Sequence, residues 1–253
     1  MAPQSPALVP VSARSLQRYL DQYSLLQQLR FRMLELSDAQ AVIELRAQVL
    51  AQLAHPDQYV VEPDEEQFVA THLHLQPQLD SWGASIGVFD GCRLVAYAML
   101  GIPSSSDPEN LAHRVGALVT LPGAAAHLAS CMVLPNYQGR HLQRNLLHIR
   151  SALAKAWGRD CCLAMVSLHN HSSRHNLMRE GLCVSWIGEI DGLRRQLLAC
   201  NPIQPWAFDM RGAQKVCSLD WQSQQSLLED GWWGVSSERE PHGSSIWFAR
   251  KLS

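Results

Sequence analysis

Apolar positions in the first part of the chain change their period in a way that predicts strands followed by helices. Phe31 to Leu36 is a short apolar run typical of a strand, and Ser37 or Asp38 then caps a helix with apolar positions as far as Leu53. A second helix is expected from Pro63 to Leu75, because acidic residues follow that proline and suit the positive end of a helix. The chain therefore begins its fold with a strand and amphipathic helices.

A hairpin and a long loop follow. Ala84 to Phe89 and Arg93 to Gly101 alternate as strands do, and the Asp90-Gly91 pair between them is a strong signal for a tight turn. Pro103 to Gly123 is rich in Ser, Pro, Asp, Asn and Gly, which predicts a loop. Because long loops in compact domains often have a function, we expect this one to form a wall of a substrate site.

The centre of the chain alternates strand and helix, and each element has a clear end. The elements expected there are a strand over His127 to Leu134 ended by Pro135, a helix over Leu142 to Trp157, a strand over Cys162 to Leu168, and a helix over Ser172 to Glu180 closed by Gly181. This order predicts a parallel strand pair with a right-handed crossover inside a mixed sheet, and so an α/β fold.

The last third gives a weaker pattern. Strands are expected over Cys183 to Ile190 and Ser245 to Leu252, with a helix over Ser218 to Glu229, and no internal repeat is visible. Proline and helix-like positions at the start suggest a helical extension over residues 1–30. We therefore expect one domain over residues 31–253, with an elaboration over about 200–253.

Composition and charge exclude several classes of function. The chain has 253 residues, 47% of them hydrophobic, and a net charge of −2 without long runs of one sign, so a nucleic-acid partner is not expected. No signal-like or membrane-spanning apolar segment is visible, which predicts a soluble, cytoplasmic protein without a membrane partner. Seven cysteines without C-x-x-C spacing indicate reduced thiols, and no metal site is expected.

The stretch from Met132 to Leu147 carries the clearest chemistry. It places a tight polar turn between a buried strand and the first turn of an amphipathic helix, where free N–H groups and the helix dipole favour an anion. Gly139 permits close approach of a phosphate, and Arg140 and Arg144 add positive charge. A solvated helix face is the alternative for the two arginines, but cations are disfavoured at a helix N-terminus, which favours an anionic ligand.

The strand, the V-x-P-x-Y-Q-G turn and the helix resemble motif A of the GNAT superfamily, which has the pattern Q/R-x-x-G-x-G/A. Gln138 matches its first position, whereas His141 and Gln143 stand where that family usually has glycines. The resemblance implies a GNAT-like mixed sheet flanked by helices and acetyl-CoA as co-substrate, with its pantetheine arm along the strand as in strand addition. The residues it implies for binding are Met132, Val133, Gln138, Gly139, Arg140, His141, Leu142, Gln143, Arg144 and Asn170.

A second motif at the correct spacing supports the resemblance. Asn170, Ser173, Gly181 and Leu182 are similar to motif B of the same superfamily, N-x-x-A/S followed by a helix and G-F. Many of those enzymes carry a tyrosine seven residues after the asparagine, which protonates the leaving thiolate, and this chain has Leu177 there. Tyr137, Asn176 or a water are alternative proton donors. A thiol with a pKa of ~8.5 can also leave as its thiolate without a donor.

The resemblance implies direct attack by a primary amine, which needs a base. His127 and Glu66 are the two candidates, and a structural role is the alternative for His127 because small apolar residues flank it. His171 and His175 share a helix face, but no H-E-x-x-H pattern accompanies them, so we do not expect zinc. The C-terminal tryptophans are interpreted as core, with a homodimer contact as the alternative; they are Trp206, Trp221, Trp232, Trp233 and Trp247.

Two functions fit the sequence. The first is an N-acyltransferase that moves an acetyl group from acetyl-CoA to an amine of a small molecule or peptide. The second is a non-catalytic acyl-CoA-binding regulatory module with the same fold, suggested by the departures at His141, Gln143 and Leu177. An acidic pocket would favour polyamines or aminoglycosides as acceptors, and an open groove would favour a peptide.

Overall fold

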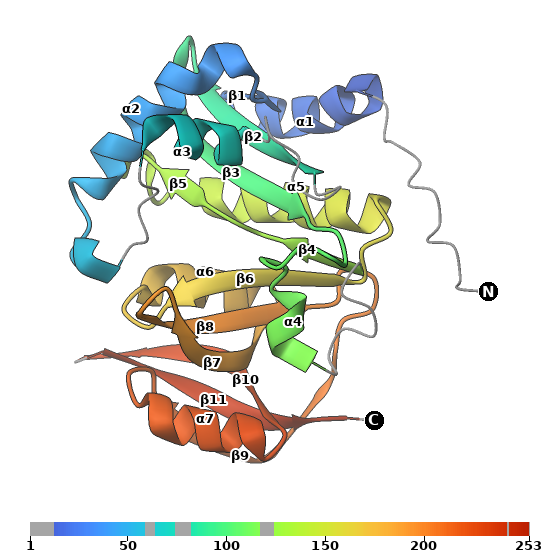
Figure 1. Cartoon of the computed structure of the whole chain (residues 1–253), viewed down its shortest axis with the longest axis vertical. Coiled ribbons are helices and arrows are strands. Elements are labelled where there is room, and N and C mark those ends of the chain that lie inside the picture. Colours follow the sequence, from blue (N-terminus) through green and yellow to red (C-terminus); the bar gives the residue numbers. More distant parts are fainter. Residues whose placement is uncertain (1–12, 59–63, 74–81, 117–123, 242, 253) are drawn as a thin grey trace.

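The structure is a computed structural model that describes residues 13–58, 64–73, 82–116, 124–241 and 243–252. In this part of the chain eleven strands form one mixed sheet (Figure 1). The order across the sheet is β1-β2-β3-β4-β6-β8-β7-β10-β11-β9, and β5 lies beside β3. No helix in these ranges is long and apolar enough to span a membrane.

The N-terminal part of the sheet is antiparallel and carries helices on both of its faces. Its elements are α1 (Ala13–Gln27), β1 (Arg30–Met33), η1 (Leu36–Asp38), α2 (Ala39–Leu50), η2 (Pro56–Gln58), α3 (Glu65–His72), β2 (Trp82–Asp90) and β3 (Arg93–Ile102). The predicted hairpin and both helices are confirmed, and Asp64 caps α3 through the Gln67 N–H. The predicted start of that helix at Pro63 lies outside the described residues. Helix α2 covers the near face of β3, while α5 lies behind it (Figure 1).

The strand predicted over His127 to Leu134 is two strands separated by a break. They are β4 (Ala125–His127) and β5 (Cys131–Val133), and Ser130 between them has a φ of 30°. Before the break the chain follows β6, with the Leu128 N–H bonded to the Leu163 carbonyl at 2.7 Å, whereas after it the chain pairs with β3. β4 lies between β3 and β6 and pairs with both, whereas β5 pairs with β3, so β5 and β6 are apart.

A buried arginine holds this break in place. Arg150 of α5 (Leu142–Ala156) donates through Nη1 to the carbonyls of Met99 and Ala129, each at 2.9 Å. The crossover through α5 leads to β6 (Cys161–Ser167), which is parallel to β4 as predicted. The predicted loop from Pro103 contains a short helix, α4 (Ala112–Val115), and residues 117–123 of that loop lie outside the described residues.

The rest of the sheet contains the same unit twice, which the sequence pattern did not reveal. The first copy is β6, α6 (His171–Arg179), β7 (Cys183–Ile190) and β8 (Leu193–Cys200), and the second is β9 (Phe208–Cys217), α7 (Trp221–Glu229), β10 (Trp232–Glu240) and β11 (Gly243–Lys251). In each copy the last strand lies between the other two, and β7 pairs with β10. The two copies therefore meet as mirror-ordered halves, β6-β8-β7 and β10-β11-β9.

The helix in each copy begins and ends at corresponding residues that lie fifty positions apart. Asn170 caps α6 by accepting the Ser173 N–H at 3.0 Å, and Asp220 caps α7 by accepting the Ser223 N–H at 3.1 Å. Gly181 and Gly231 follow the two helices with φ of 87° and 80°. Sequence reasoning found motif B once, although the chain contains its spacing a second time.

Buried polar side chains join the two copies. Arg174, at 0% exposure, donates through Nη1 to Gln196 Oε1 at 3.1 Å, and Gln196 Nε2 donates to Gln224 Oε1 at 2.5 Å. Because Arg174 lies on α6 and Gln224 on α7, both helices cover the same face of the sheet. Arg174 Nη2 also donates to Ser244 Oγ at 3.1 Å, and burial lowers the pKa of Arg174 to about 10.

Candidate active site

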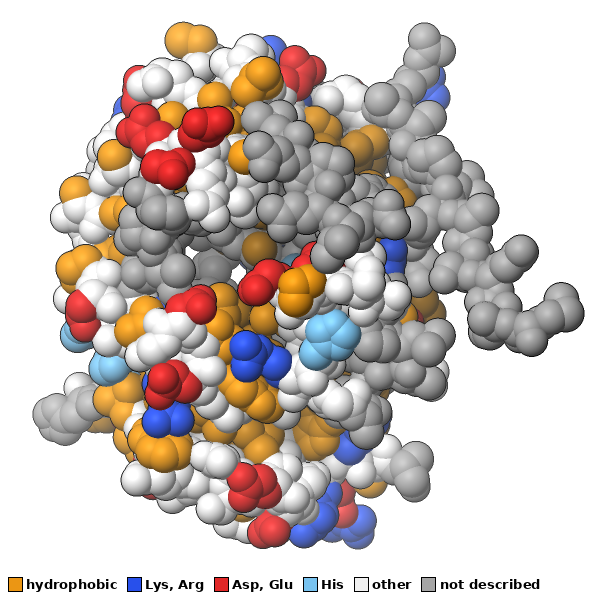
Figure 2. Space-filling view, in the orientation of Figure 1, with side chains coloured by type: hydrophobic (Ala, Val, Ile, Leu, Met, Phe, Trp, Pro, Cys, Tyr) orange, Lys and Arg blue, Asp and Glu red, His pale blue; other side chains and the backbone are white. Residues whose placement is uncertain are grey.

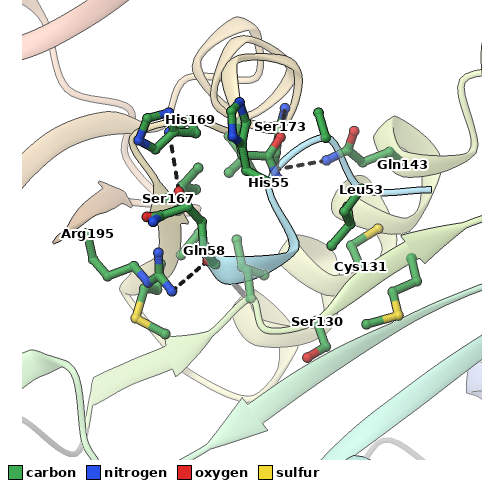
Figure 3. A pocket seen from close by; sticks show the side chains of 18 of the residues that line it. Leu53, His55, Gln58, Ser130, Cys131, Gln143, Ser167, His169, Ser173 and Arg195 are labelled. Carbon is green, nitrogen blue, oxygen red and sulfur yellow. Dashed lines mark hydrogen bonds between the residues drawn. The ribbon is translucent and has the colours of Figure 1, made fainter. Parts of the chain in front are cut away.

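A cavity of about 470 Å³ opens where β5 and β6 separate. Its walls come from the segment around η2, from β5 and β6, from the first turns of α5 and α6, and from β8 (Figure 3). On the face seen in Figure 2 the surface is hollowed between the part that carries α2 and α3 and the part that carries β6. The predicted strand and the two motif helices thus meet around one space.

The main chain of β5 is available on the cavity side. The Leu134 N–H bonds to the Val95 carbonyl at 2.9 Å, and Met132 lies opposite Tyr97 in the same ladder. Hydrogen-bonding residues alternate in an antiparallel pair, so the N–H and C=O groups of Cys131 and Val133 point away from β3 and toward the gap. The main-chain groups of Val133 thus face the gap, where the resemblance would put a pantetheine arm. The main chain of Met132 faces β3 instead, and the second residue whose main chain faces the gap is Cys131.

The turn before α5 is left-handed at two positions. Gly139 has a φ of 78° and His141 a φ of 59°, and the Asn145 N–H bonds to the His141 carbonyl at 3.0 Å to begin the helix. His141 therefore adopts the conformation that a glycine would supply, at a cost of about 1–2 kcal/mol. Gln138 is exposed, while the Leu142 side chain is buried in the core, so only the Leu142 main chain faces the turn.

The two arginines at this turn differ in their surroundings. Arg144 Nε lies 2.6 Å from Glu180 Oε1 of the turn after α6, and His148 Nε2 contacts the other oxygen of the same carboxylate at 2.5 Å. Arg140 lies over the ring of Tyr137, 4.8 Å from its centroid. Arg140 is therefore the arginine whose contacts leave its charge for a ligand, and Arg144 would have to share its charge with Glu180.

Gln143 connects the two motif helices at the edge of the cavity. Its Nε2 donates to Ser173 Oγ at 3.2 Å (Figure 3), and its Oε1 accepts from Asn176 Nδ2 at 2.6 Å. Asn170, Ser173 and Gln143 all line the cavity. Gln143, which stands where the resembled motif usually has a glycine, therefore connects the first turn of α5 to α6.

The structure does not bring the three predicted catalytic side chains into the cavity. Tyr137 donates its hydroxyl proton to Asp90 Oδ2 at 2.6 Å, which raises the pKa of Tyr137, and Glu66 is exposed on α3. His127 Nε2 accepts the Leu111 N–H at 3.1 Å, and burial lowers the pKa of His127 to about 4. The structural alternative for His127 fits these contacts, because its ring is neutral and its lone pair is already used.

Sequence reasoning did not assign His55 or Arg195 to a site, and it considered His169 only as part of a zinc interpretation that it set aside; all three line the cavity. The rings of His55 and His169 lie 4.8 Å apart between centroids, one from the segment before η2 and one after β6. Arg195 lies on β8, which the sequence pattern did not predict, and its Nη2 donates to the Gln58 carbonyl at 2.8 Å (Figure 3). Their meeting depends on contacts between distant segments, for which no local spacing gives a signal.

The chain has a mixed α/β fold that matches solved acetyltransferase structures, one of which is described as a GNAT family member. No family model and no curated protein matches the chain.

Three solved structures illustrate the likeness. A candidate acetyltransferase from Salmonella typhimurium, solved with its cofactor acetyl-CoA, is 19% identical, covers 70% of this chain and 97% of its own, and has a TM-score of 0.50. An N-acetyltransferase from Staphylococcus aureus is 12% identical over 69% and 98%, with a TM-score of 0.51. A candidate acetyltransferase of the GNAT family from Desulfovibrio desulfuricans is 17% identical over 69% and 99%, with a TM-score of 0.50.

Proposed function

We propose that this protein is an N-acyltransferase that moves an acetyl group from acetyl-CoA to a primary amine. The observation that carries the proposal is the open edge of β5, where the main-chain groups of Cys131 and Val133 point away from β3 and Cys131 lines the cavity. An extended pantetheine arm can pair with such an edge as an added strand. A GNAT-like structure solved with acetyl-CoA is consistent with the same co-substrate here.

The turn before α5 fits a pyrophosphate. The first N–H groups of a helix have no partner within the helix, and the first turn of α5 contains no acidic residue. Gly139 has open space where a side chain would begin, and Arg140 lies beside it with its charge over Tyr137. We therefore propose that Gln138 to Arg144 hold the phosphates, with Asn170 and Ser173 lining the path into the cavity.

The proposed reaction is direct attack of the amine on the thioester carbonyl. A neutral amine nitrogen forms the new C–N bond, a β5 N–H stabilises the oxyanion, and the C–S bond breaks to release the thiolate of CoA. His55 and His169 are the proposed acceptors of the amine proton, because they line the cavity and the candidates from the sequence do not. Leu177 stands at the position of the family's acid, so we propose that the thiolate leaves without a side-chain donor.

One observation favours the second function, a non-catalytic acyl-CoA-binding module. Leu177 is buried in the cavity wall, and among the described residues that line the cavity there is no tyrosine or carboxylate to act as acid. Turnover separates the two functions, because a binding module retains acetyl-CoA without releasing CoA.

The test is calorimetric titration of the full chain with acetyl-CoA, followed by CoA release with a panel of primary amines. Gly139→Leu places a side chain where the phosphates are proposed to lie and should lower affinity by about 100-fold or more, equivalent to about 2.7 kcal/mol. Gly158→Leu is the matched control, because Gly158 has a φ of 70° with open space around it and lies at the other end of α5. Both variants carry similar backbone strain.

Three outcomes are informative. Wild-type binding that Gly139→Leu loses and Gly158→Leu keeps, together with amine-dependent CoA release, supports the acyltransferase. Binding without release for any amine favours the regulatory module. Absence of acetyl-CoA binding by the wild-type chain contradicts both functions.

A further inference from the structure

The cavity contains a buried cation with an unused donor. Arg195 is only 3% exposed, and its Nη1 has no hydrogen-bond partner among the described residues. Its Nη2 is held by the Gln58 carbonyl at 2.8 Å, which fixes the plane of the guanidinium at the cavity wall (Figure 3). A buried donor without a partner costs free energy, so its retention indicates that another group completes it.

The charge of the cavity wall indicates what that group is. The described residues that line the cavity include two arginines, Arg150 and Arg195, and no aspartate or glutamate. The positive charge of Arg150 is surrounded by the carbonyls that it holds at the strand break, namely those of Met99, Ala129 and Leu146. Arg195 differs in that its buried Nη1 has no carbonyl or carboxylate partner among the described residues, and a polycationic acceptor would meet repulsion at this wall.

Arg195 lies in the part of the cavity wall that β6, β8 and the segment around η2 form, and we take this part as the side that receives the acceptor. Arg195 lies opposite Ser167 of β6 in the sheet register. Gln58 and His55, from the segment around η2, line the same cavity. The open edge of β5 and the turn before α5 form the other side. Arg195 and the open edge of β5 thus line one cavity from different strands.

We propose that the amine acceptor carries a carboxylate, which Arg195 binds through Nη1 while the amine is acetylated at the β5 edge. This inference rests on the proposed acyltransferase function and adds the class of acceptor to it. A guanidinium presents donors in a fixed plane that matches a carboxylate, and such charge-assisted bonds are stronger than neutral ones. The reaction leaves the carboxylate unchanged: the amine nitrogen gains the acetyl group and loses a proton, and CoA leaves as its thiolate.

The test compares matched acceptors. Straight-chain ω-amino acids with one to five methylene groups between amine and carboxylate are each compared with their carboxamides, and kcat and KM are measured from CoA release. We expect the wild-type chain to favour the acid over the amide by about 10- to 100-fold in kcat/KM at the best chain length. In Arg195→Gln this ratio should fall to about 1, mainly through KM of the acid.

Two further variants separate recognition from structure. Arg195→Gln keeps an amide donor for the Gln58 carbonyl, and Arg195→Lys should retain part of the preference because it keeps the charge. Arg194→Gln is the matched control, because Arg194 lies on the opposite face of β8 with its guanidinium 3.8 Å from the centre of the Trp221 ring. A purely structural Arg195 would lower kcat/KM for acid and amide equally.

The outcomes distinguish this inference from the proposed function. Equal use of acids and amides by the wild-type chain, or an equal loss for both in Arg195→Gln, overturns the carboxylate proposal and leaves the acyltransferase in place. Acetyl-CoA binding without CoA release for any amine overturns the acyltransferase itself. Calorimetry of acetyl-CoA with Arg195→Gln should give the wild-type affinity, because Arg195 lies away from the phosphate turn.

Discussion

The two copies of the strand-helix-strand-strand unit differ in their neighbours more than in their own construction. Both have a capped helix and a positive-φ glycine at the same spacing. In the first copy β6 lies beside β4 and faces the separated β5, whereas in the second copy the equivalent strand, β9, lies at the end of the sheet. The cavity lies beside the first copy, where Ala164 to Ser167 of β6 form part of its wall.

This difference teaches what motif B contributes. Its asparagine, serine and glycine specify a short helix that starts and ends at defined residues, and Asp220, Ser223 and Gly231 do the same elsewhere. A site arises only where a broken strand and the N-terminus of another helix come near that start. Ser173 lies in the cavity wall, whereas its equivalent Ser223 is exposed.

The largest effect is expected at the buried contact between the copies. Arg174→Ala removes donors from Leu168, Gln196 and Ser244 and leaves buried acceptors unsatisfied, so the free energy of unfolding should fall by about 3 kcal/mol or more. Gln224→Ala, at the equivalent position, should cost about 1–2 kcal/mol because it makes fewer such bonds. Urea unfolding of both variants checks the order, and equal losses would show that the copies contribute alike.

The second prediction compares a residue in the cavity wall with the equivalent exposed residue of the other copy. Ser173→Phe fills the cavity between α5 and α6 and should weaken acetyl-CoA binding by about 100-fold, equivalent to about 2.7 kcal/mol. Ser223→Phe is the matched control, since its side chain is exposed at the same position of α7 and should leave affinity unchanged. Calorimetry measures both, and similar affinities in the two variants would contradict the placement of the ligand beside α6.

The smallest effect concerns β4, the neighbour that the second copy lacks. Burial holds the pKa of His127 at about 4, below its usual value near 6.5, so the neutral ring is favoured in the folded chain. The contribution of this neutral ring to the free energy of unfolding is complete above pH 6.5 and is lost as pH falls toward 4. By pH 5 the free energy of unfolding should have fallen by about 2 kcal/mol. His127→Asn should show a shallower fall in urea-unfolding free energy from pH 7 to pH 5; an unchanged fall would assign the titration to other groups.

Local signals in the sequence predicted much of the fold. Turn residues, caps and apolar periods located the hairpin, helices α2, α3, α5 and α6, and the parallel pair of β4 and β6. They did not predict β8, β9 and β10. Residues 193–200 contain two arginines and a glutamine among leucines, and two of these polar side chains, Arg195 and Gln196, are buried by contacts with distant segments. Such burial has no local signature.

The candidate site was predictable only where one segment forms it. The turn at Gly139 and the start of α6 at Asn170 follow from short-range chemistry, and the structure places both near the cavity. The break at Ser130 was not visible, because it is imposed by pairing with two different strands and by Arg150. His55 and Arg195 were missed for the same reason, since 139 intervening residues separate positions that share one wall.

The ends of the sheet bear on how copies of this chain behave at high concentration. At β1, the Phe31 N–H donates to Ser24 Oγ and the Phe31 carbonyl accepts from Gln17, so side chains of α1 occupy main-chain groups that another strand would need. At β9, Gly212 with a φ of 78° bends the strand, and Arg211 and Lys215 place charge along it. Features at both edge strands thus oppose pairing with a strand of another copy, which is the first step of edge-to-edge aggregation.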